Sequence, residues 1–175
     1  MLIVVGGSHQ GKLAFAMQWY DLTKEDVADL AETPGKKLSG IKLSDEKLSN
    51  EDKYCEVIAQ KRIWNHFHEY IRRKLLEMLD AQNVVSRKDG AGTNRKMIME
   101  TEAVLVERLM EPIWSYLAAN PDTIIICDEI GCGLIPMDAF ERQYRDIVGR
   151  CMCELTKQAK EVVRITCGLP TWMKE

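Results

Sequence analysis

The sequence predicts an α/β fold with a mostly parallel central sheet, and three observations support this prediction. The chain opens with an apolar run, Leu2–Val5, that ends in two glycines. A second apolar run at 123–127 ends in two acidic residues. Elsewhere, apolar residues recur every three or four positions over long stretches, which is the spacing of amphipathic helices. Buried strands separated by such helices favour a parallel sheet covered by helices.

The first predicted strand is followed by a segment with the spacing of a phosphate-binding loop. Residues 6–12 read Gly-Gly-Ser-His-Gln-Gly-Lys, which fits G-x-x-x-x-G-K, and a helical segment follows at 14–20. In such a loop the backbone N–H groups, the lysine and the dipole of the next helix all favour a bound anion. A plain glycine turn is the alternative interpretation. We expect nucleotide binding at Gly6, Gly7, Ser8, His9, Gln10, Gly11, Lys12 and Leu13.

The loop departs from its pattern at one position. The pattern places Ser or Thr after the lysine, so that a hydroxyl can reach Mg²⁺. This chain has Leu13 there. The sequence therefore predicts a loop that holds phosphates while one metal ligand is missing.

The segment 21–100 is expected to be a divergent region of helices and loops. Residues 21–55 are polar and charged and predict a surface loop with short elements. Residues 55–79 predict one long helix. The segment 84–96 contains glycines and four basic residues, which indicate either a lid over a polyphosphate or a solvated loop. The apolar face of the predicted helix consists of Trp64, Phe67, Ile71, Leu75 and Met78.

The last part of the chain alternates again between helices and strands. Residues 101–118 predict a helix that Pro112 should kink or restart, because proline cannot donate to the helical ladder. A further helix is expected from 139 to about 159, with Asp138 as its N-cap. The segment 161–167 predicts a terminal strand, which Gly168–Pro170 would close.

Two carboxylates follow the predicted strand at 123–127. Asp128 and Glu129 would lie at the carboxyl end of a parallel core strand, where nucleotide sites hold Mg²⁺ or orient a water. The loop at 6–12 follows another such strand, so both groups should meet at one edge of the sheet. We therefore expect Asp128 and Glu129 to be the candidate Mg²⁺ ligands.

Composition indicates one domain spanning 1–175 and limits the partners. A formal charge of −3 gives no reason to expect nucleic acid or an anionic membrane. The chain has no apolar run of about 20 residues and no basic leader, so we expect a cytoplasmic protein. Six cysteines are expected to be buried small hydrophobes. A zinc site of Cys151 and Cys153 with His66 or His68 is a weaker hypothesis.

Two segments carry a resemblance to a known family. Residues 128–136 read Asp-Glu-Ile-Gly-Cys-Gly-Leu-Ile-Pro, and residues 140–150 contain Tyr-Arg-Asp-Ile-Val-Gly-Arg. Together with the loop at 5–12, they resemble the bifunctional adenosylcobinamide kinase / adenosylcobinamide-phosphate guanylyltransferase family of cobalamin assembly. That family has E-V-G-x-G-I-V-P, F-R-D-I-x-G-R and T-G-G-x-R-S-G-K-S at the corresponding places.

The resemblance implies a P-loop NTPase-like fold of three layers that binds ATP or GTP. It implies transfer of a γ-phosphoryl group to the aminopropanol hydroxyl of adenosylcobinamide, and a second step through a guanylylated histidine. Lys12 would then brace the β- and γ-phosphates, and Glu129 would lie beside the reacting phosphate or metal. Arg145, Asp146 and Arg150 match the helix motif, and we interpret them as structural ion pairs in preference to ligand contacts. The resemblance also implies a homotrimer.

Departures from the family favour the kinase over the guanylyltransferase. His9 and Gln10 replace the family's arginine and serine, in addition to Leu13. The segment 62–66 echoes the family's R-I-x-H-H, but Asn65 would occupy the acceptor position. The kinase hypothesis therefore has one competitor, a degenerate homologue that keeps the phosphate loop and acts as a nucleotide-sensing or partner-binding subunit.

Overall fold

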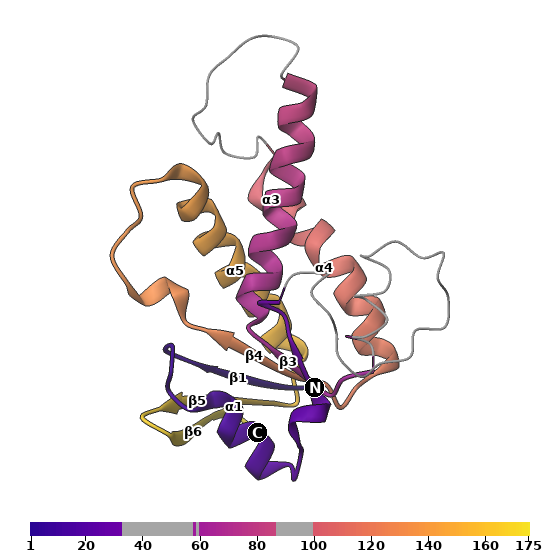
Figure 1. The fold of residues 1–175 in the computed structure, drawn as a ribbon, viewed down its shortest axis with the longest axis vertical. Helices are drawn as coiled ribbons and strands as arrows, with labels where there is room; N and C mark the ends of the chain where they lie inside the picture. Colours follow the sequence, from indigo (N-terminus) through magenta and orange to yellow (C-terminus); the bar gives the residue numbers. More distant parts are fainter. Residues whose placement is uncertain (33–57, 59, 87–99) are drawn as a thin grey trace.

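The structure is a computed structural model that describes residues 1–32, 58, 60–86 and 100–175 (Figure 1). The expectations for 33–55 and for 87–96 lie outside these residues. The strands are β1 (Leu2–Gly6), β2 (Val27–Asp29), β3 (Ile63–Asn65), β4 (Ile124–Asp128), β5 (Glu161–Thr166) and β6 (Leu169–Lys174). The helices are α1 (Lys12–Trp19), α3 (Phe67–Ser86), α4 (Glu102–Ala119) and α5 (Ala139–Gln158), with 3₁₀ turns η1 (Lys24–Asp26) and η3 (Ile130–Cys132).

The six strands form one sheet in the order β2-β3-β4-β1-β5-β6. All neighbouring strands are parallel except β5 and β6, which are antiparallel. This confirms the predicted α/β fold with a mostly parallel central sheet, and it is consistent with a P-loop NTPase-like architecture.

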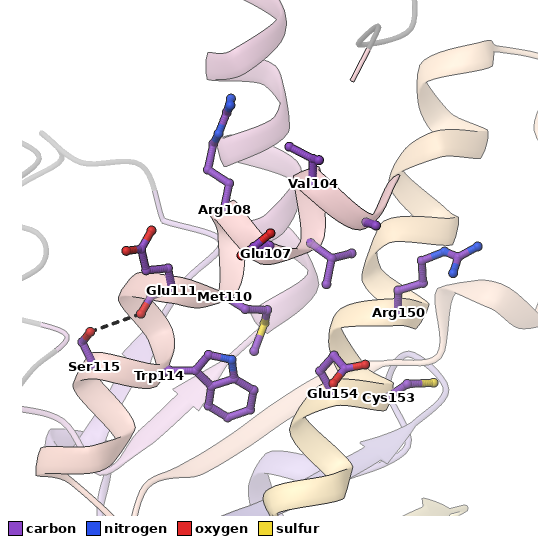
Figure 2. A pocket seen from close by; sticks show the side chains of 12 residues that line it. Val104, Glu107, Arg108, Met110, Glu111, Trp114, Ser115, Arg150, Cys153 and Glu154 are labelled. Carbon is purple, nitrogen blue, oxygen red and sulfur yellow. Dashed lines mark hydrogen bonds between the residues drawn. The ribbon is translucent and has the colours of Figure 1, made fainter. Parts of the chain in front are cut away.

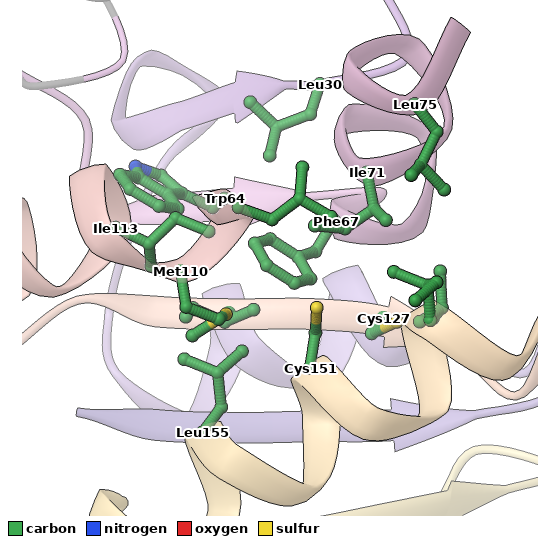
Figure 3. Packing of buried hydrophobic residues seen from close by; sticks show 14 of the residues in the cluster. Leu30, Trp64, Phe67, Ile71, Leu75, Met110, Ile113, Cys127, Cys151 and Leu155 are labelled. Atoms are coloured by element: carbon green, nitrogen blue, oxygen red, sulfur yellow. The ribbon is translucent and has the colours of Figure 1, made fainter. Parts of the chain in front are cut away.

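Helices cover both faces of the sheet, which gives three layers (Figure 1). The larger apolar cluster lies between the sheet and α3, α4 and α5 (Figure 3). The smaller cluster lies on the other face, where Ala16 of α1 packs on the strands. β1 serves both clusters because its side chains alternate: Ile3 belongs to the larger cluster, and Leu2 and Val4 belong to the smaller one.

The predicted helix at 55–79 is wrong at its start. Residues 63–65 form strand β3, and the described helix begins at Phe67. Trp64 fits the helical period but pairs with Ile125 in the sheet, so strand pairing overrides the apparent period. Phe67, Ile71 and Leu75 are fully buried on one face of α3, as the spacing predicts.

Pro112 does not restart the helix that contains it. α4 runs without interruption from Glu102 to Ala119. Pro112 lies on the exposed face, so the carbonyl that loses its helical donor is open to solvent.

The positions of two edge strands were not predicted. β2 lies in the segment interpreted as a surface loop. β6 begins at Leu169, where the sequence suggested that the chain simply closes. Cys167 and Gly168 both adopt positive φ, 52° and 81°, and this allows a two-residue turn that returns the chain beside β5. Pro170 is tolerated because β6 is an edge strand.

Of the five cysteines that the structure describes, two are buried and three are exposed. Burial raises the pKa of the Cys127 and Cys151 thiols to about 12, as expected for small core residues. Cys132, Cys153 and Cys167 are exposed, which corrects the expectation of general burial. Among the described residues, no helix is both long enough and apolar enough to span a bilayer.

Candidate functional site

The two sequence segments expected to meet do lie together at the carboxyl edge of the sheet. β1 and β4 are adjacent and parallel, and Gly6 pairs in register with Asp128. The loop at 7–11 continues from β1 into α1 at the same edge (Figure 1). The backbone N–H of Glu129 also donates to the Gly6 carbonyl at 3.0 Å. The edge is therefore fixed by backbone pairing as well as by side chains.

The path of the loop depends on two glycines of the motif. Gly6 has φ of 155°, and a Cβ atom there would lie 2.3 Å from the Ile165 carbonyl oxygen. Gly11 has φ of 85° and occupies the N-cap position of α1. These conformations are accessible to glycine and costly for other residues. The glycines are thus required by the chain path itself.

Lys12 is buried and bonds to the loop on one side and to β4 on the other. Its ammonium donates to the Gly7 carbonyl at 2.6 Å and lies 2.7 Å from Asp128 Oδ1, and the residue is 6% exposed. Burial alone would raise the pKa of Asp128, but hydrogen bonds from Lys12 and Ser8 and the Lys12 charge outweigh it and lower that pKa. The loop and β4 are therefore joined by an ionised pair.

The turn between β5 and β6 braces the loop from outside. The Gly168 N–H donates to the Gln10 carbonyl at 3.0 Å, and the Cys167 N–H donates to Gln10 Oε1. The sequence analysis assigned Gln10 to the loop. It gave no signal for these two hydrogen bonds, because β6 itself was not predicted.

The two predicted metal ligands point to different partners. Asp128 bonds to Lys12, whereas Glu129 Oε2 lies 2.9 Å from the Arg164 guanidinium of β5. Among the described residues, no group of three or more His, Cys, Asp or Glu side chains has the geometry of a metal site. The same finding gives no support to the zinc hypothesis.

Leu13 and His9 show what replaces the usual loop residues. Leu13 is half-buried and packs against the smaller apolar cluster beneath α1. His9 is exposed and has a positive φ of 58°. Position 13 therefore contributes packing where the motif would supply a hydroxyl.

Three further residues lie at this edge: the sequence analysis named His66 and His68 only as possible zinc ligands and did not name Asp29. His68 is buried on the first turn of α3, and its Nδ1 accepts from the Asp128 N–H at 3.3 Å. Burial lowers the pKa of His68, which keeps the ring neutral. His66 lies between β3 and α3, with Nδ1 2.7 Å from Asp29 Oδ1 at the end of β2. The unpredicted strand β2 explains why Asp29 gave no signal.

The arginines of the helix motif make intramolecular contacts. The Arg145 guanidinium donates to the carbonyls of Gly131, Gly133 and Leu134, and Arg150 Nε lies 2.6 Å from Glu102 Oε2. Arg145 thus fixes the loop after β4. Arg150 thus forms an ion pair, as interpreted from the sequence, whereas Arg145 bonds to backbone carbonyls instead.

A separate open groove of about 1030 Å³ lies between α4 and α5 (Figure 2). Val104, Met110 and Trp114 face it from α4, and Arg150 and Glu154 face it from α5. None of its lining residues belongs to the phosphate loop or to the carboxyl edge of the sheet. Its size therefore does not make it the candidate site.

Comparison with known proteins gives one family. A family model described as cobinamide kinase / cobinamide phosphate guanyltransferase matches residues 59–173. No curated protein matches the chain. The matched range includes Asp128, Glu129 and the helix motif, whereas the phosphate loop precedes it. The family supports a kinase or guanylyltransferase role in cobalamin biosynthesis, with nucleotide and corrinoid substrates.

Proposed function

Because the chain belongs to the cobinamide kinase / cobinamide phosphate guanyltransferase family, we propose that it is a nucleotide-dependent kinase with a corrinoid acceptor. ATP or GTP binds on the loop at 6–12, and its γ-phosphoryl group is transferred to the aminopropanol hydroxyl of a cobinamide. The whole chain, 1–175, acts as one nucleotide-binding domain in this proposal, and a homotrimer is the assembly that the family resemblance suggests.

The buried Lys12–Asp128 pair is the observation that carries the proposal. A buried ammonium is costly unless anionic or polar groups surround it. Asp128 supplies one such partner at 2.7 Å, and the β- and γ-phosphates of a nucleotide supply others within the glycine loop. The loop amides of residues 7–11, the N-terminus of α1 and the Lys12 charge then stabilise the same anion.

The residues present fit a magnesium ion in part. Asp128 offers an ionised carboxylate, and Ser8, whose hydroxyl bonds to Asp128, offers a second oxygen donor. Glu129 is the other candidate ligand, although it pairs with Arg164. Mg²⁺ would neutralise developing charge on the phosphates, and their oxygens and waters would complete its shell in place of the hydroxyl absent at Leu13.

The proposed function does not include guanylyl transfer, because no histidine occupies the acceptor position. The chain has three histidines, His9, His66 and His68, and none lies between positions 10 and 65. Asn65, which would occupy the acceptor position of the R-I-x-H-H-like segment, is a buried residue of β3. The second candidate function is a degenerate homologue that binds nucleotide without transferring phosphate, and Leu13 is the observation that favours it.

Calorimetric titration with ATP and GTP, with and without Mg²⁺, tests the binding half of the proposal. Lys12→Met keeps the aliphatic stem and removes the charge, so we expect nucleotide affinity to fall about 100-fold, the equivalent of about 3 kcal/mol from charge-assisted bonds. Lys160→Ala, at the opposite edge of the sheet, is the matched control and should bind as the wild type does. Unchanged affinity in Lys12→Met would contradict the assigned loop.

Transfer of labelled phosphate from ATP or GTP to cobinamide separates the two candidate functions. Labelled cobinamide phosphate, made by the wild type and not by Lys12→Met, supports the kinase. Tight nucleotide binding without any transfer would instead support the degenerate homologue.

A further inference from the structure

A row of polar side chains continues along the carboxyl edge of the sheet beyond the phosphate loop. It starts at Lys12 and Asp128 and passes to His68, which accepts from the Asp128 N–H at 3.3 Å. The rings of His68 and His66 are perpendicular, with centroids 5.9 Å apart. The row ends at Asp29 on β2. It therefore leads from Lys12 and Asp128 toward β3 and β2, which lie on one side of β4.

The geometry of the last pair fixes the tautomer of His66. An ionised carboxylate only accepts hydrogen bonds, so the 2.7 Å contact with Asp29 Oδ1 places the imidazole proton on Nδ1. The same Oδ1 accepts from the Ala31 N–H at 3.1 Å, which holds the carboxylate in place. Asn65 Nδ2 also lies 3.1 Å from His66 Nδ1. Because a protonated Nδ1 cannot accept a hydrogen bond, this tautomer requires the Asn65 amide to turn its oxygen toward the ring. Nε2 is then left with a lone pair that is available to accept a proton.

The backbone around this pair is held in an uncommon conformation. His66 has φ of 57°, a left-handed conformation that is infrequent outside glycine. It is fixed on both sides, since the Glu69 N–H donates to the His66 carbonyl and the Leu30 N–H donates to the Asn65 carbonyl, each at 2.9 Å. Arg73 also donates to the Leu30 carbonyl at 3.1 Å, which ties the segment after β2 to α3. Strain held in this way is typical of functional positions.

Exposure distinguishes His66 from His68. The side chains of His66 and Asp29 are 38% and 37% exposed, so the pair is accessible from solvent. His68 is buried, and its Nδ1 already accepts a backbone hydrogen bond. His66 is therefore the histidine that meets both geometric requirements of a base, an oriented ring and an open nitrogen.

We propose that the Asp29–His66 pair is the general base that activates the acceptor hydroxyl in the phosphoryl transfer, an inference that rests on the proposed function. His66 Nε2 takes the hydroxyl proton while the hydroxyl oxygen bonds to the γ-phosphorus. The bond from that phosphorus to the β–γ bridging oxygen breaks, and its electron pair leaves with the nucleoside diphosphate. Asp29 stabilises the resulting imidazolium, which returns its proton to water.

The test compares transfer and binding in matched variants. For His66→Ala we expect the turnover number for phosphoryl transfer to cobinamide to fall 10²–10³-fold, within the usual contribution of a general base. Calorimetric affinity for ATP should not change, because His66 lies outside the loop. Asp29→Asn should lower turnover by about tenfold, because the side-chain amide no longer favours the Nδ1–H tautomer. Asp122→Asn, at the amino end of β4, is the matched control and should transfer at the wild-type rate.

Two further readouts separate a base from a structural residue. Added imidazole should restore transfer in His66→Ala. The pH dependence of the transfer rate should differ between the wild type and that variant. Two titratable groups lie beside the His66 ring: Asp29 from β2 contacts its Nδ1, and the His68 ring from α3 is 5.9 Å away between centroids.

The outcomes distinguish this inference from the proposed function. A wild type that binds nucleotide but transfers nothing overturns both. A wild type that transfers phosphate, together with His66→Ala that transfers equally well, overturns the inference alone. Reduced transfer with no rescue by imidazole and an unchanged pH profile would assign His66 a structural role and would also overturn the inference.

Discussion

The two ends of the polar row differ in how they are built. The proposed phosphate side is a contiguous segment, 6–12, and its central cation, Lys12, is 6% exposed and paired with Asp128. The other side joins Asp29 and His66, which are 37 positions apart in the chain and open to solvent. One side holds a permanent charge in the protein interior. The other places an imidazole nitrogen at the edge of the sheet, where the proposed acceptor would approach.

This difference fits a division of labour within one site. A phosphate group needs fixed positive charge and oriented amides, which are most effective where water is excluded. An acceptor that must enter and leave needs an open approach, and a base that acts on it must be able to gain and lose a proton. Changes on the phosphate side should therefore alter stability and nucleotide affinity, whereas changes on the histidine side should alter turnover.

The largest effect on stability is expected from Gly6→Ala. The new methyl group would meet the Ile165 carbonyl at 2.3 Å, and φ of 155° is strained for alanine, so we expect a loss of about 3 kcal/mol or more in the free energy of unfolding. Urea denaturation measures it. Gly149→Ala, in α5 with open space around it, is the matched control and should gain about 0.5–1 kcal/mol. A cost below about 1 kcal/mol for Gly6→Ala would mean that β5 yields and that the loop is less rigid than described.

The loop at 6–12 could be predicted from the sequence because its residues are adjacent in the chain. A strand, glycines at fixed offsets and a lysine form one motif, and its structural context follows along the chain. The position of Asp128 at the end of a core strand was also predicted, since a strand rich in isoleucine that ends in acids is distinct from its surroundings. The conformation of Gly6 and the burial of Lys12 then depend on β4 and β5, which sequence spacing does not reveal.

The histidine side was not readable, for two physical reasons. β2 and β3 are three residues each, too short for a periodic pattern, and their stability comes from pairing with neighbours. Trp64 also extended the helical period of α3 into β3, which placed His66 on a helix instead of at a strand end. Its approach to Asp29 follows from sheet order, and sheet order is a property of the whole fold.

Leu13→Ser tests whether position 13 contributes apolar packing at the expense of a hydroxyl ligand for Mg²⁺. Leu13 is half-buried against the smaller cluster, so we expect a loss of about 1–2 kcal/mol in the free energy of unfolding, below the cost for a fully buried leucine. We also expect the dependence of ATP affinity on Mg²⁺ to increase, because the serine hydroxyl restores a ligand that the loop pattern provides. Denaturation and calorimetry with and without Mg²⁺ measure the two effects.

Leu169→Ser is the matched control for the loss of unfolding free energy expected from the lost packing of Leu13. Leu169 is 71% exposed on β6, so its replacement should change stability by less than about 0.5 kcal/mol. If Leu13→Ser gains both Mg²⁺ dependence and faster transfer to cobinamide, the chain is a kinase weakened by one substitution. If stability falls and the Mg²⁺ dependence does not change, position 13 serves packing alone.

The smallest effect concerns His68, which lies between the two sides. Burial lowers the pKa of His68, and Asp128 and Glu69 raise it only in part. The unfolded chain binds a proton near the ordinary value of about 6.5, whereas the folded chain resists protonation down to a lower pH. The unfolded state therefore binds more protons between these two values, and the contribution of a neutral His68 to stability is lost as pH falls below about 6.5.

His68→Gln removes this titration and keeps an acceptor for the Asp128 N–H. Unfolding free energies measured by urea denaturation between pH 8 and pH 5 should fall less steeply in this variant than in the wild type. Parallel curves would contradict a buried neutral His68. Because His68 contacts Asp128 on one side and faces His66 on the other, the same variant measures how far the two sides depend on each other. If nucleotide affinity and turnover both stay within about twofold of wild type, less than 0.5 kcal/mol, the two sides work independently.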